Sequence, residues 1–358
     1  MSNHITIPTE PIGSIPRTNE VLKGLQSFEE GMISQTQLDA LYEQATQDTI
    51  RRFEATGSPV ITDGEQSKPS FATYPLAGLK NLAPDGVKIP FAAGHVRQLP
   101  RLTGGPFRYQ LYADQYLAAA RKHTNLPVKQ AVISASALSL LYPPDGIDGY
   151  PQEEFLVDLV REAETDIRRC LENGAHNVQI DFTEGRLAVK LDPSKQLLKN
   201  FIALNNQVLE RFSDAERSKI GVHTCPGGDR NSTHSADVDY AELIPDLLDL
   251  KAGNFYFQLA SESDRVRVLK IIRENAGHDR RIFVGVIDPI NPAVETPETV
   301  RDRILEASEH LPLNQLGTTD DCGFSPFGDD TSTARETAFA KIRARIEGTQ
   351  LAARALGL

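Results

Sequence analysis

One histidine and two cysteines have the types and spacing of metal ligands. His223 and Cys225 lie two positions apart at the end of the apolar run 220–225, so on a strand their side chains point to the same side. Cys322 ends another such run. Imidazole with two thiolates is a typical zinc ligand set, and three protein ligands leave one position open for chemistry. The alternative is that Cys225 and Cys322 are small buried hydrophobic residues, as we expect for Cys170 on the apolar face of a helix.

The two thiolates indicate which chemistry such a zinc ion favours. They make the metal electron-rich and so a weak Lewis acid, but it can take a substrate thiol as a further ligand and hold it as a thiolate at neutral pH. The bound sulfur is then a nucleophile, which predicts alkyl transfer to a thiol. Two alternatives remain. In one, zinc carries a water that hydrolyses or cleaves a small acid; in the other, the metal is structural and the domain binds a partner.

The ligands must be positioned by the elements around them, and these alternate between strand and helix. The strand-like runs are short, rich in Val, Ile and Phe, and end in Gly, Pro, Asp or Ser; they end at 11–14 and cover 58–65, 128–135, 177–181, 220–225, 254–259, 282–288 and 315–322. Apolar residues at helical spacing cover 38–55, 152–172, 194–212, 239–251, 264–275, 297–309 and 333–347.

Alternating units of this kind predict a parallel sheet with helices outside it. Eight units predict an α/β fold of the (β/α)8 TIM barrel type, formed by residues 1–358 as a single domain, with the chemistry at the carboxyl ends of the strands. Residues 75–125 exceed what one crossover needs, so we expect an insertion after the second strand, a hairpin followed by a helix. The expected strand ends are mostly polar: Ser14, Glu65, Ser134, Asp181, His223, Cys225, Gln258, Asp288 and Cys322.

Composition excludes several classes of protein. The chain has 358 residues, 40% of them hydrophobic, and a net charge of -11 without any Lys/Arg block, so we expect neither a nucleic-acid partner nor an anionic membrane surface. No stretch approaches the roughly 20 apolar residues of a membrane helix, and residues 1–14 lack the pattern of a secretory leader. Three cysteines do not make a disulfide framework. We therefore expect a cytoplasmic protein.

Five motifs in order carry a family resemblance: Ile12-Gly13-Ser14, Asp63-Gly64-Glu65, Gln179-Ile180-Asp181, Val222-His223-Thr224-Cys225 and Asp321-Cys322-Gly323-Phe324. With them the chain resembles, over nearly its whole length, the cobalamin-independent methionine synthases, in particular their C-terminal catalytic barrel. It looks like a short, core-only relative of that family. The resemblance implies a methyltransferase of methionine biosynthesis that uses zinc to transfer a methyl group to homocysteine.

The resemblance also implies roles for individual residues. His223, Cys225 and Cys322 would hold the zinc ion. The segment from Ile12 to Ser14 would bind the substrate carboxylate, and Glu65 and Asp181 its amino group. A zwitterionic amino acid needs such groups in a partly dehydrated site. Ordinary capping of strand ends is the alternative for the two carboxylates.

The fourth zinc ligand departs from the family pattern. The family has a glutamate at the end of the sixth strand, where this chain reads Gln258-Leu-Ala-Ser-Glu262. Gln258 is nearest the aligned position but is a poor zinc ligand, whereas Glu262 is chemically suitable and four residues late. We slightly favour Glu262; Gln258 and the substrate itself remain alternatives. Asp320 and Asp321 are candidates for orienting the ligands from outside the coordination sphere.

The proton donor departs as well. The family has Asp-X-His near the seventh strand, where the histidine protonates the leaving folate nitrogen, but this chain reads Asp288-Pro289-Ile290. Asp288 remains a catalytic candidate, and His234, in the loop 231–237, is the candidate replacement acid; an exposed loop histidine is the alternative. Methyl-folate should therefore be a poor donor, and methylcobalamin a better one, unless His234 or another group supplies the proton.

The methyl donor is left open by a third departure. The chain has no Trp, and no region resembling the family's N-terminal barrel, so the usual platform for a polyglutamyl folate is not evident. Short relatives of this kind include proteins that take methyl groups from other carriers, such as a corrinoid protein, and thiol alkyltransferases that open epoxides. A small-molecule thiol, with homocysteine favoured, is the expected acceptor in each case.

Overall fold

A six-stranded parallel sheet forms the centre of the computed structural model, which describes residues 6–358. Residues 1–5, part of the segment inspected for a leader, lie outside the described residues. The strand order is β12-β11-β10-β7-β6-β5, with β5 at Gln130–Ile133, β6 at Val178–Asp181, β7 at Ile220–Thr224, β10 at Asn254–Phe257, β11 at Arg281–Ile287 and β12 at Leu316–Asp320. The predicted parallel α/β architecture is confirmed.

Two extended segments join the open edges of this sheet. Thr9 forms a parallel bridge with Thr318 of β12, and Ile61 forms one with Val128, just before β5. The two segments also contact each other, because the Ile15 N–H donates to the Gly64 carbonyl at 3.0 Å. The eight predicted strand positions thus form a closed ring of parallel segments, although the first two contribute single bridges rather than full strands.

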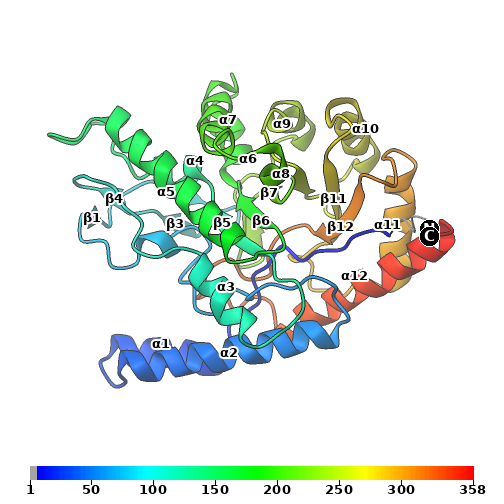
Figure 1. Cartoon of the computed structure of the whole chain (residues 1–358), viewed down its shortest axis with the longest axis horizontal. Helices are drawn as coiled ribbons and strands as arrows, with labels where there is room; N and C mark the ends of the chain where they lie inside the picture. Colours follow the sequence, from blue (N-terminus) through cyan, green and yellow to red (C-terminus); the bar gives the residue numbers. More distant parts are fainter. Residues whose placement is uncertain (1–5) are drawn as a thin grey trace.

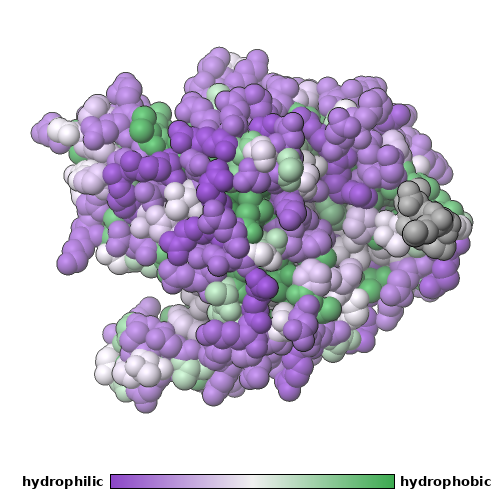
Figure 2. All heavy atoms as spheres, in the orientation of Figure 1, coloured by the Kyte–Doolittle hydropathy of each residue, from purple (hydrophilic) through white to green (hydrophobic). Residues whose placement is uncertain are grey.

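Helices surround the parallel strands (Figure 1). They are α1 Asn19–Glu29, α2 Gln35–Ala55, α3 Asp114–Arg121, α4 Ala135–Ser139, α5 Gln152–Glu172, α6 Glu184–Leu191, α7 Gln196–Leu209, α8 Asp214–Arg217, α9 Tyr240–Leu247, α10 Arg265–Asn275, α11 Pro297–Ser308 and α12 Arg335–Ala355. The face of the molecule in Figure 2 is largely hydrophilic. Among residues 6–358, no helix is long and apolar enough to cross a membrane.

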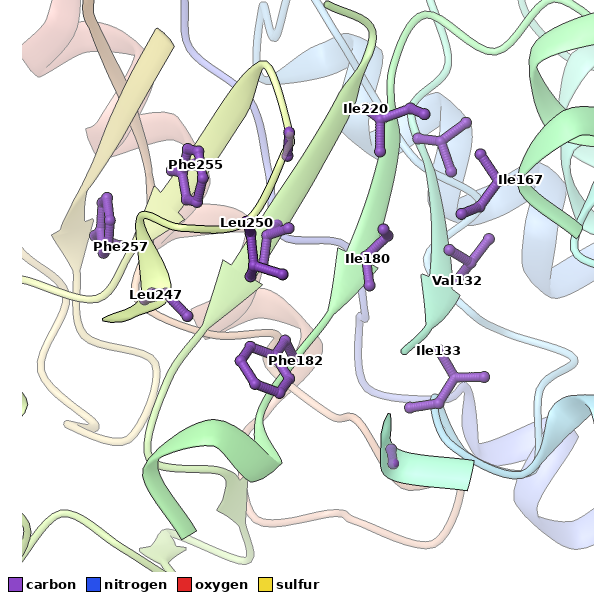
Figure 3. Close-up of a cluster of buried hydrophobic side chains, with 14 of the residues drawn as sticks. Val132, Ile133, Ile167, Ile180, Phe182, Ile220, Leu247, Leu250, Phe255 and Phe257 are labelled. Atoms are coloured by element: carbon purple, nitrogen blue, oxygen red, sulfur yellow. The ribbon is translucent and has the colours of Figure 1, made fainter. Parts of the chain in front are cut away.

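Strands β6 and β7 alternate between an apolar outer face and a largely polar inner one. In β6, Val178 and Ile180 pack in the main hydrophobic core, which also contains Ile167 of α5, whereas Gln179 turns into the ring and donates to the Ile12 carbonyl at 3.1 Å. Figure 3 shows the layer of side chains between strands and helices. Burying one Ile or Phe side chain stabilises the fold by about 1.5–3 kcal/mol, so this layer holds the strands in register.

The segment from the second ring position to β5 contains a nested hairpin and then α3. β1 (Leu82–Ala83) pairs with β4 (Arg101–Leu102), and inside them β2 (Lys88–Pro90) pairs with β3 (Val96–Gln98), all antiparallel. We call residues 82–102 the roof hairpin. Its tip contacts the small sheet of β8 (Gly228–Asp229) and β9 (Ser232–Thr233) through the Ala92 N–H and the Thr233 carbonyl, 2.9 Å apart. The hairpin therefore covers the end of β7.

Candidate metal centre

His223, Cys225 and Cys322 converge at the carboxyl ends of β7 and β12. Their ligand atoms all lie within 4.8 Å of one another, and all three side chains are buried. The Sγ atoms of Cys225 and Cys322 are 3.1 Å apart. Nearly a hundred residues separate the two cysteines in the chain, so their meeting depends on the closed ring of strands.

Local sequence explains how each ligand reaches the centre. Ile220 and Val222 of β7 pack in the hydrophobic core, so the alternating positions His223 and Cys225 face the interior of the ring. Beyond β12, Gly323 follows Cys322. A Cβ at Gly323 would lie 2.1 Å from the Ser14 Oγ, so glycine is needed for this close approach.

Asp181 sets the orientation of the His223 ring. The Asp181 Oδ1 lies 3.1 Å from the His223 Nδ1, which leaves Nε2, 3.3 Å from the Asp321 carbonyl, as the nitrogen for a metal. Burial disfavours the charged imidazolium, but the hydrogen bond and charge of Asp181 outweigh it and raise the pKa of His223. A carboxylate that accepts from the far nitrogen of a histidine is a common support for zinc ligands.

The two cysteine sulfurs behave as a pair that shares a proton. The hydrogen bond from the Cys225 thiol lowers the pKa of Cys322, whereas burial and the Cys322 sulfur raise the pKa of Cys225 well above its ordinary value. The Gly227 N–H also donates to the Cys225 Sγ at 3.4 Å. A soft cation can replace the shared proton and hold both residues as thiolates, so the donor set fits zinc.

Asp321 ties the loop after β10 to the metal centre. Its carboxylate accepts from the N–H groups of Leu259, Ala260 and Ser261 at 2.8–2.9 Å, while burial raises its pKa to about 6. Asp320 instead pairs with Arg345 at 2.6 Å inside the ring. Of these two aspartates, Asp321 is the one that braces the backbone beside Cys322.

A small cavity of about 60 Å³ opens beside the ligands, and we call it the thiol cavity. Its lining contains the four predicted substrate residues and two of the candidate metal ligands, namely Ile12, Ser14, Glu65, Asp181, His223 and Cys322. Its other wall is apolar and includes Phe71, Ile89, Phe91 and Phe327. The predicted substrate residues are therefore brought together next to the metal ligands.

The two carboxylate oxygens of Glu65 differ in their hydrogen bonds. Its Oε1 accepts from the Lys68 Nζ at 3.1 Å, and its Oε2 has no hydrogen-bond partner in the part of the chain that the structure describes. Burial raises the pKa of Glu65, against the opposing charge of Lys68. Lys68 could not be predicted from the sequence, because no periodic pattern marks the loop in which it is buried.

Ser14 is held by the segment that follows Cys322. The Ser325 N–H donates to the Ser14 Oγ at 3.2 Å, and the Phe324 N–H donates to the Ser14 carbonyl at 3.0 Å. The Ile12 carbonyl is already bonded to Gln179. These hydrogen bonds attach the first ring segment to the loop that carries Cys322.

Glu262 lies outside the group of three ligands. It lines a separate polar cavity of about 400 Å³, together with Gln258, Asp288 and Cys322. Its carboxylate accepts from Arg186 at 2.8 Å, and the same guanidinium donates to the Gln258 Oε1 at 3.1 Å. Arg186 of α6, which the sequence analysis missed, thus competes with a metal for both candidate fourth ligands.

Asp288 caps a turn rather than facing the ligands. Its Oδ1 accepts from the N–H groups of Ile290 and Asn291 at 3.0 and 3.3 Å. It shares the polar cavity with Cys322, which also lines the thiol cavity. Asp288 therefore lies beside the candidate metal centre, and its carboxylate is hydrogen-bonded to its own loop.

His234 is buried, so the alternative of an exposed loop histidine is wrong; only 6% of it is exposed. It lines the thiol cavity, edge to face with Phe91 of the roof hairpin at 5.4 Å. Burial, helped by Lys190 and Arg186, lowers the pKa of His234 to about 4. The imidazole is therefore neutral at pH 7, which weakens its case as the proton donor.

Contacts with the buried Asp229 fix the roof hairpin above the thiol cavity. The Arg97 guanidinium donates to both carboxylate oxygens of the buried Asp229, at 2.6 and 2.9 Å, and His95 lies 2.9 Å from the same carboxylate. Arg97 also packs over the Phe327 ring at 4.2 Å. A bidentate pair of this kind orients the hairpin as well as attaching it.

Comparisons with known proteins agree with this fold and site. A family model described as the catalytic domain of cobalamin-independent synthase matches residues 7–343. A methionine synthase from Saccharolobus solfataricus is 20% identical over 351 residues, covering 98% of this chain and 96% of that protein. A 5-methyltetrahydropteroyltriglutamate–homocysteine methyltransferase from Synechococcus sp. is 24% identical, over 88% of this chain but only 40% of its own length.

The fold is shared with a solved structure as well. A B12-independent methionine synthase from Shewanella sp. W3-18-1, in complex with selenomethionine, superposes with a TM-score of 0.76 at 17% identity, covering 98% of this chain and 99% of that one. At this identity the likeness concerns the fold. Because the family model matches almost the whole chain, the chain belongs to the family of cobalamin-independent methionine synthase catalytic domains.

Proposed function

We propose that this protein transfers a methyl group to the thiol of homocysteine with a zinc ion bound by His223, Cys225 and Cys322. The observation that carries the proposal is the convergence of these three ligands beside a cavity with two acidic side chains, Glu65 and Asp181. Zinc bound there would hold the substrate sulfur as a thiolate. The Synechococcus relative, whose name is that of a homocysteine methyltransferase, supports the same acceptor.

The chain's own residues position the acceptor. The Glu65 Oε2 lacks a partner within residues 6–358, so it can accept a hydrogen bond from the substrate ammonium. Asp181 lines the same cavity while it orients His223. The apolar side chains of Phe71 and of Phe91 in the roof hairpin line the cavity and would limit the access of water to the sulfur. Much of the rate enhancement would come from holding thiolate and methyl carbon in line.

The fourth zinc position remains a choice between Glu262, Gln258 and the substrate sulfur. The Arg186 contacts of both side chains favour the substrate in this position. Replacing Arg186 with Gln should then leave the zinc affinity nearly unchanged. If Glu262 is a ligand instead, releasing it from Arg186 should tighten zinc binding, which a chelator competition measures.

The proposal is tested by following methionine formation with the zinc-loaded protein. Homocysteine is offered with methyl-folate, methylcobalamin or a small epoxide, and products are identified by mass spectrometry. We expect a methylated thiol from at least one methyl donor, loss of activity after zinc removal, and recovery when zinc is restored. Alkylation only by the epoxide would indicate a thiol alkyltransferase, and hydrolysis without any thiol product would contradict the proposal.

A further inference from the structure

A third cavity adjoins the thiol cavity and is not used by the proposed acceptor. It has a volume of about 230 Å³, and we call it the side cavity. The two cavities share lining residues, including Phe71, Ile89, Thr183 and Phe327, so they are neighbours. The side cavity has a largely apolar wall with a few polar groups, which is typical of a site for an organic molecule.

Glu184, the first residue of α6, lies in the wall of this cavity. It is only 5% exposed. Its Oε1 accepts hydrogen bonds from the Ser134 and Ser136 hydroxyls, and its Oε2 has no partner among the residues that the structure describes. A buried carboxylate oxygen without a partner is costly, so this oxygen is suited either to carry a proton or to meet a ligand.

The surroundings of Glu184 favour the protonated form. Burial raises the pKa of Glu184 to about 7, against the two serine hydroxyls, and the nearby charge of Asp181 adds to the increase. On the α7 side, Asn205 is neutral and donates to the Ser136 Oγ at 2.7 Å. Arg186, the next charged residue of α6, is directed to Glu262 instead.

We propose that Glu184 donates a proton to the leaving nitrogen of an N-methyl donor that occupies the side cavity. This inference rests on the proposed function, since the methyl acceptor is the thiolate in the neighbouring thiol cavity. The donor class is a tertiary amine on a largely apolar ring system, because the side cavity offers the aromatic side chains Phe71 and Phe327. Besides Glu184, its charged lining residues are Arg97 and Asp329, which pair with each other at 2.8 Å. Such an amine leaves poorly unless it is protonated.

The reaction balances in atoms and charge. The thiolate sulfur forms a bond to the methyl carbon while the carbon–nitrogen bond breaks, and its electron pair stays on the nitrogen. That nitrogen takes the proton from the Glu184 carboxyl, which becomes a carboxylate held by the Ser134 and Ser136 hydroxyls. The acceptor thiol releases one proton when it becomes a thiolate. The Glu184 carboxylate takes up one proton after each turnover, so the proton count of the cycle is balanced.

Neither His234 nor the residue at position 290 can supply the proton as Glu184 can. His234 lines both cavities, but burial keeps its imidazole neutral at pH 7. Ile290, in the loop after β11, has no ionisable side chain and lines the polar cavity together with Cys322. Glu184 therefore meets the condition left open by the sequence, that another group supplies the proton for a nitrogen donor.

The test compares Glu184→Gln with the matched control Glu153→Gln. Both residues lie in the first turn of a helix, but Glu153, in α5, is exposed. Each variant is assayed with homocysteine and either methyl-folate or methylcobalamin, at equal zinc content. We expect Glu184→Gln to lower kcat with methyl-folate by about 10²–10⁴-fold, and to change it less than threefold with methylcobalamin, whose cobalt leaving group takes no proton.

Two further readouts separate chemistry from structure. The wild-type rate with methyl-folate should fall as the pH rises through the pKa of Glu184, whereas the rate with methylcobalamin should not. Glu184→Asp should keep part of the activity, and the zinc content and homocysteine binding of all variants should match the wild type. Equal losses with both donors, or lost zinc, would assign Glu184 a structural role and overturn the proposal.

The outcomes also distinguish this inference from the proposed function. If the wild type methylates homocysteine but Glu184→Gln retains full activity with methyl-folate, the Glu184 assignment is wrong and the proposed function stands. If the wild type uses methylcobalamin alone, the Glu184 assignment is likewise wrong and the proposed function stands. If the wild type transfers no methyl group from any donor, the proposed function is wrong, and the Glu184 assignment is rejected with it.

Discussion

At the metal centre, Asp181 decides which nitrogen of His223 faces the two cysteines. Its hydrogen bond to Nδ1 leaves Nε2 for the metal. Asp181 also lines the thiol cavity, so under the proposed function its carboxylate would both orient the ligand and contact the substrate.

Replacing Asp181 with Asn should weaken zinc binding by about 10–100-fold, because the ring of His223 loses its fixed orientation. The measurement is competition with a chromophoric chelator at pH 7. The control is Asp148→Asn, at an exposed loop position far from any ligand in the chain. An unchanged zinc affinity in Asp181→Asn would mean that the ligands hold His223 without this carboxylate.

His234 provides a prediction about pH. Its pKa is lowered by burial to about 4, from an ordinary value of 6.5, so the folded chain binds fewer protons there than the unfolded chain. Stability from this residue is complete above about pH 6.5 and is lost as the pH falls toward 4, by an amount on the order of 3 kcal/mol.

The prediction is tested with His234→Gln and, as control, the exposed His278→Gln. Urea unfolding is measured for each protein at pH 7.5 and 4.5. The loss of stability between the two values should be smaller for His234→Gln than for wild type and for the control. Zinc release at low pH is common to all three proteins, so a difference between them reports the histidine. Parallel losses in all three would show that His234 is solvated.

Among the elements, the turn between β7 and β8 is the tightest part of the site. Gly227 has a positive φ of 68°, and a Cβ there would lie 1.8 Å from the His234 Nε2. The turn therefore needs glycine for two reasons, the backbone conformation and the contact with His234. Its N–H also donates to the Cys225 sulfur, so a shift of the turn reaches the metal ligands.

Gly227→Ala should destabilise the fold and reduce zinc occupancy. The control is Gly277→Ala, because Gly277 has a similar φ of 71° but nothing within 4 Å of its Cβ position. Backbone strain alone costs about 1 kcal/mol, so Gly277→Ala should lose about that much and Gly227→Ala clearly more. Equal losses in thermal unfolding, with full zinc in both variants, would show that His234 moves aside easily.

The elements were largely predictable from the sequence, for a physical reason. Strands such as β6 and β7 alternate between apolar outer and polar inner residues, and α5 has one apolar face, so local patterns define them. In contrast, α6 was not predicted, and with it Arg186 and Glu184 were missed. Their importance arises from contacts with Glu262 and with Ser134, which are far away in the sequence and leave no local pattern.

At the scale of the whole molecule, the site depends on segments that are far apart in the sequence. Ser14 and Cys322 belong to opposite ends of the described chain, and the closed ring of strands places them side by side. The roof hairpin, from the middle of the first half, covers them through Arg97 and Asp229. The burial of His234 under this hairpin could not be predicted, because a loop composition does not show which segment covers it.

The measurement that tests the central proposal most directly is X-ray absorption at the zinc edge, with and without saturating homocysteine. The wild type should show two sulfur ligands, from Cys225 and Cys322, and homocysteine should add a third at about 2.3 Å. Cys322→Ser should lose one sulfur or the metal itself, whereas Cys170→Ser, with its cysteine buried in the core away from the ligands, should match the wild type. An unchanged sulfur count with homocysteine bound, or full and unaltered zinc coordination in Cys322→Ser, would contradict the proposed thiolate mechanism.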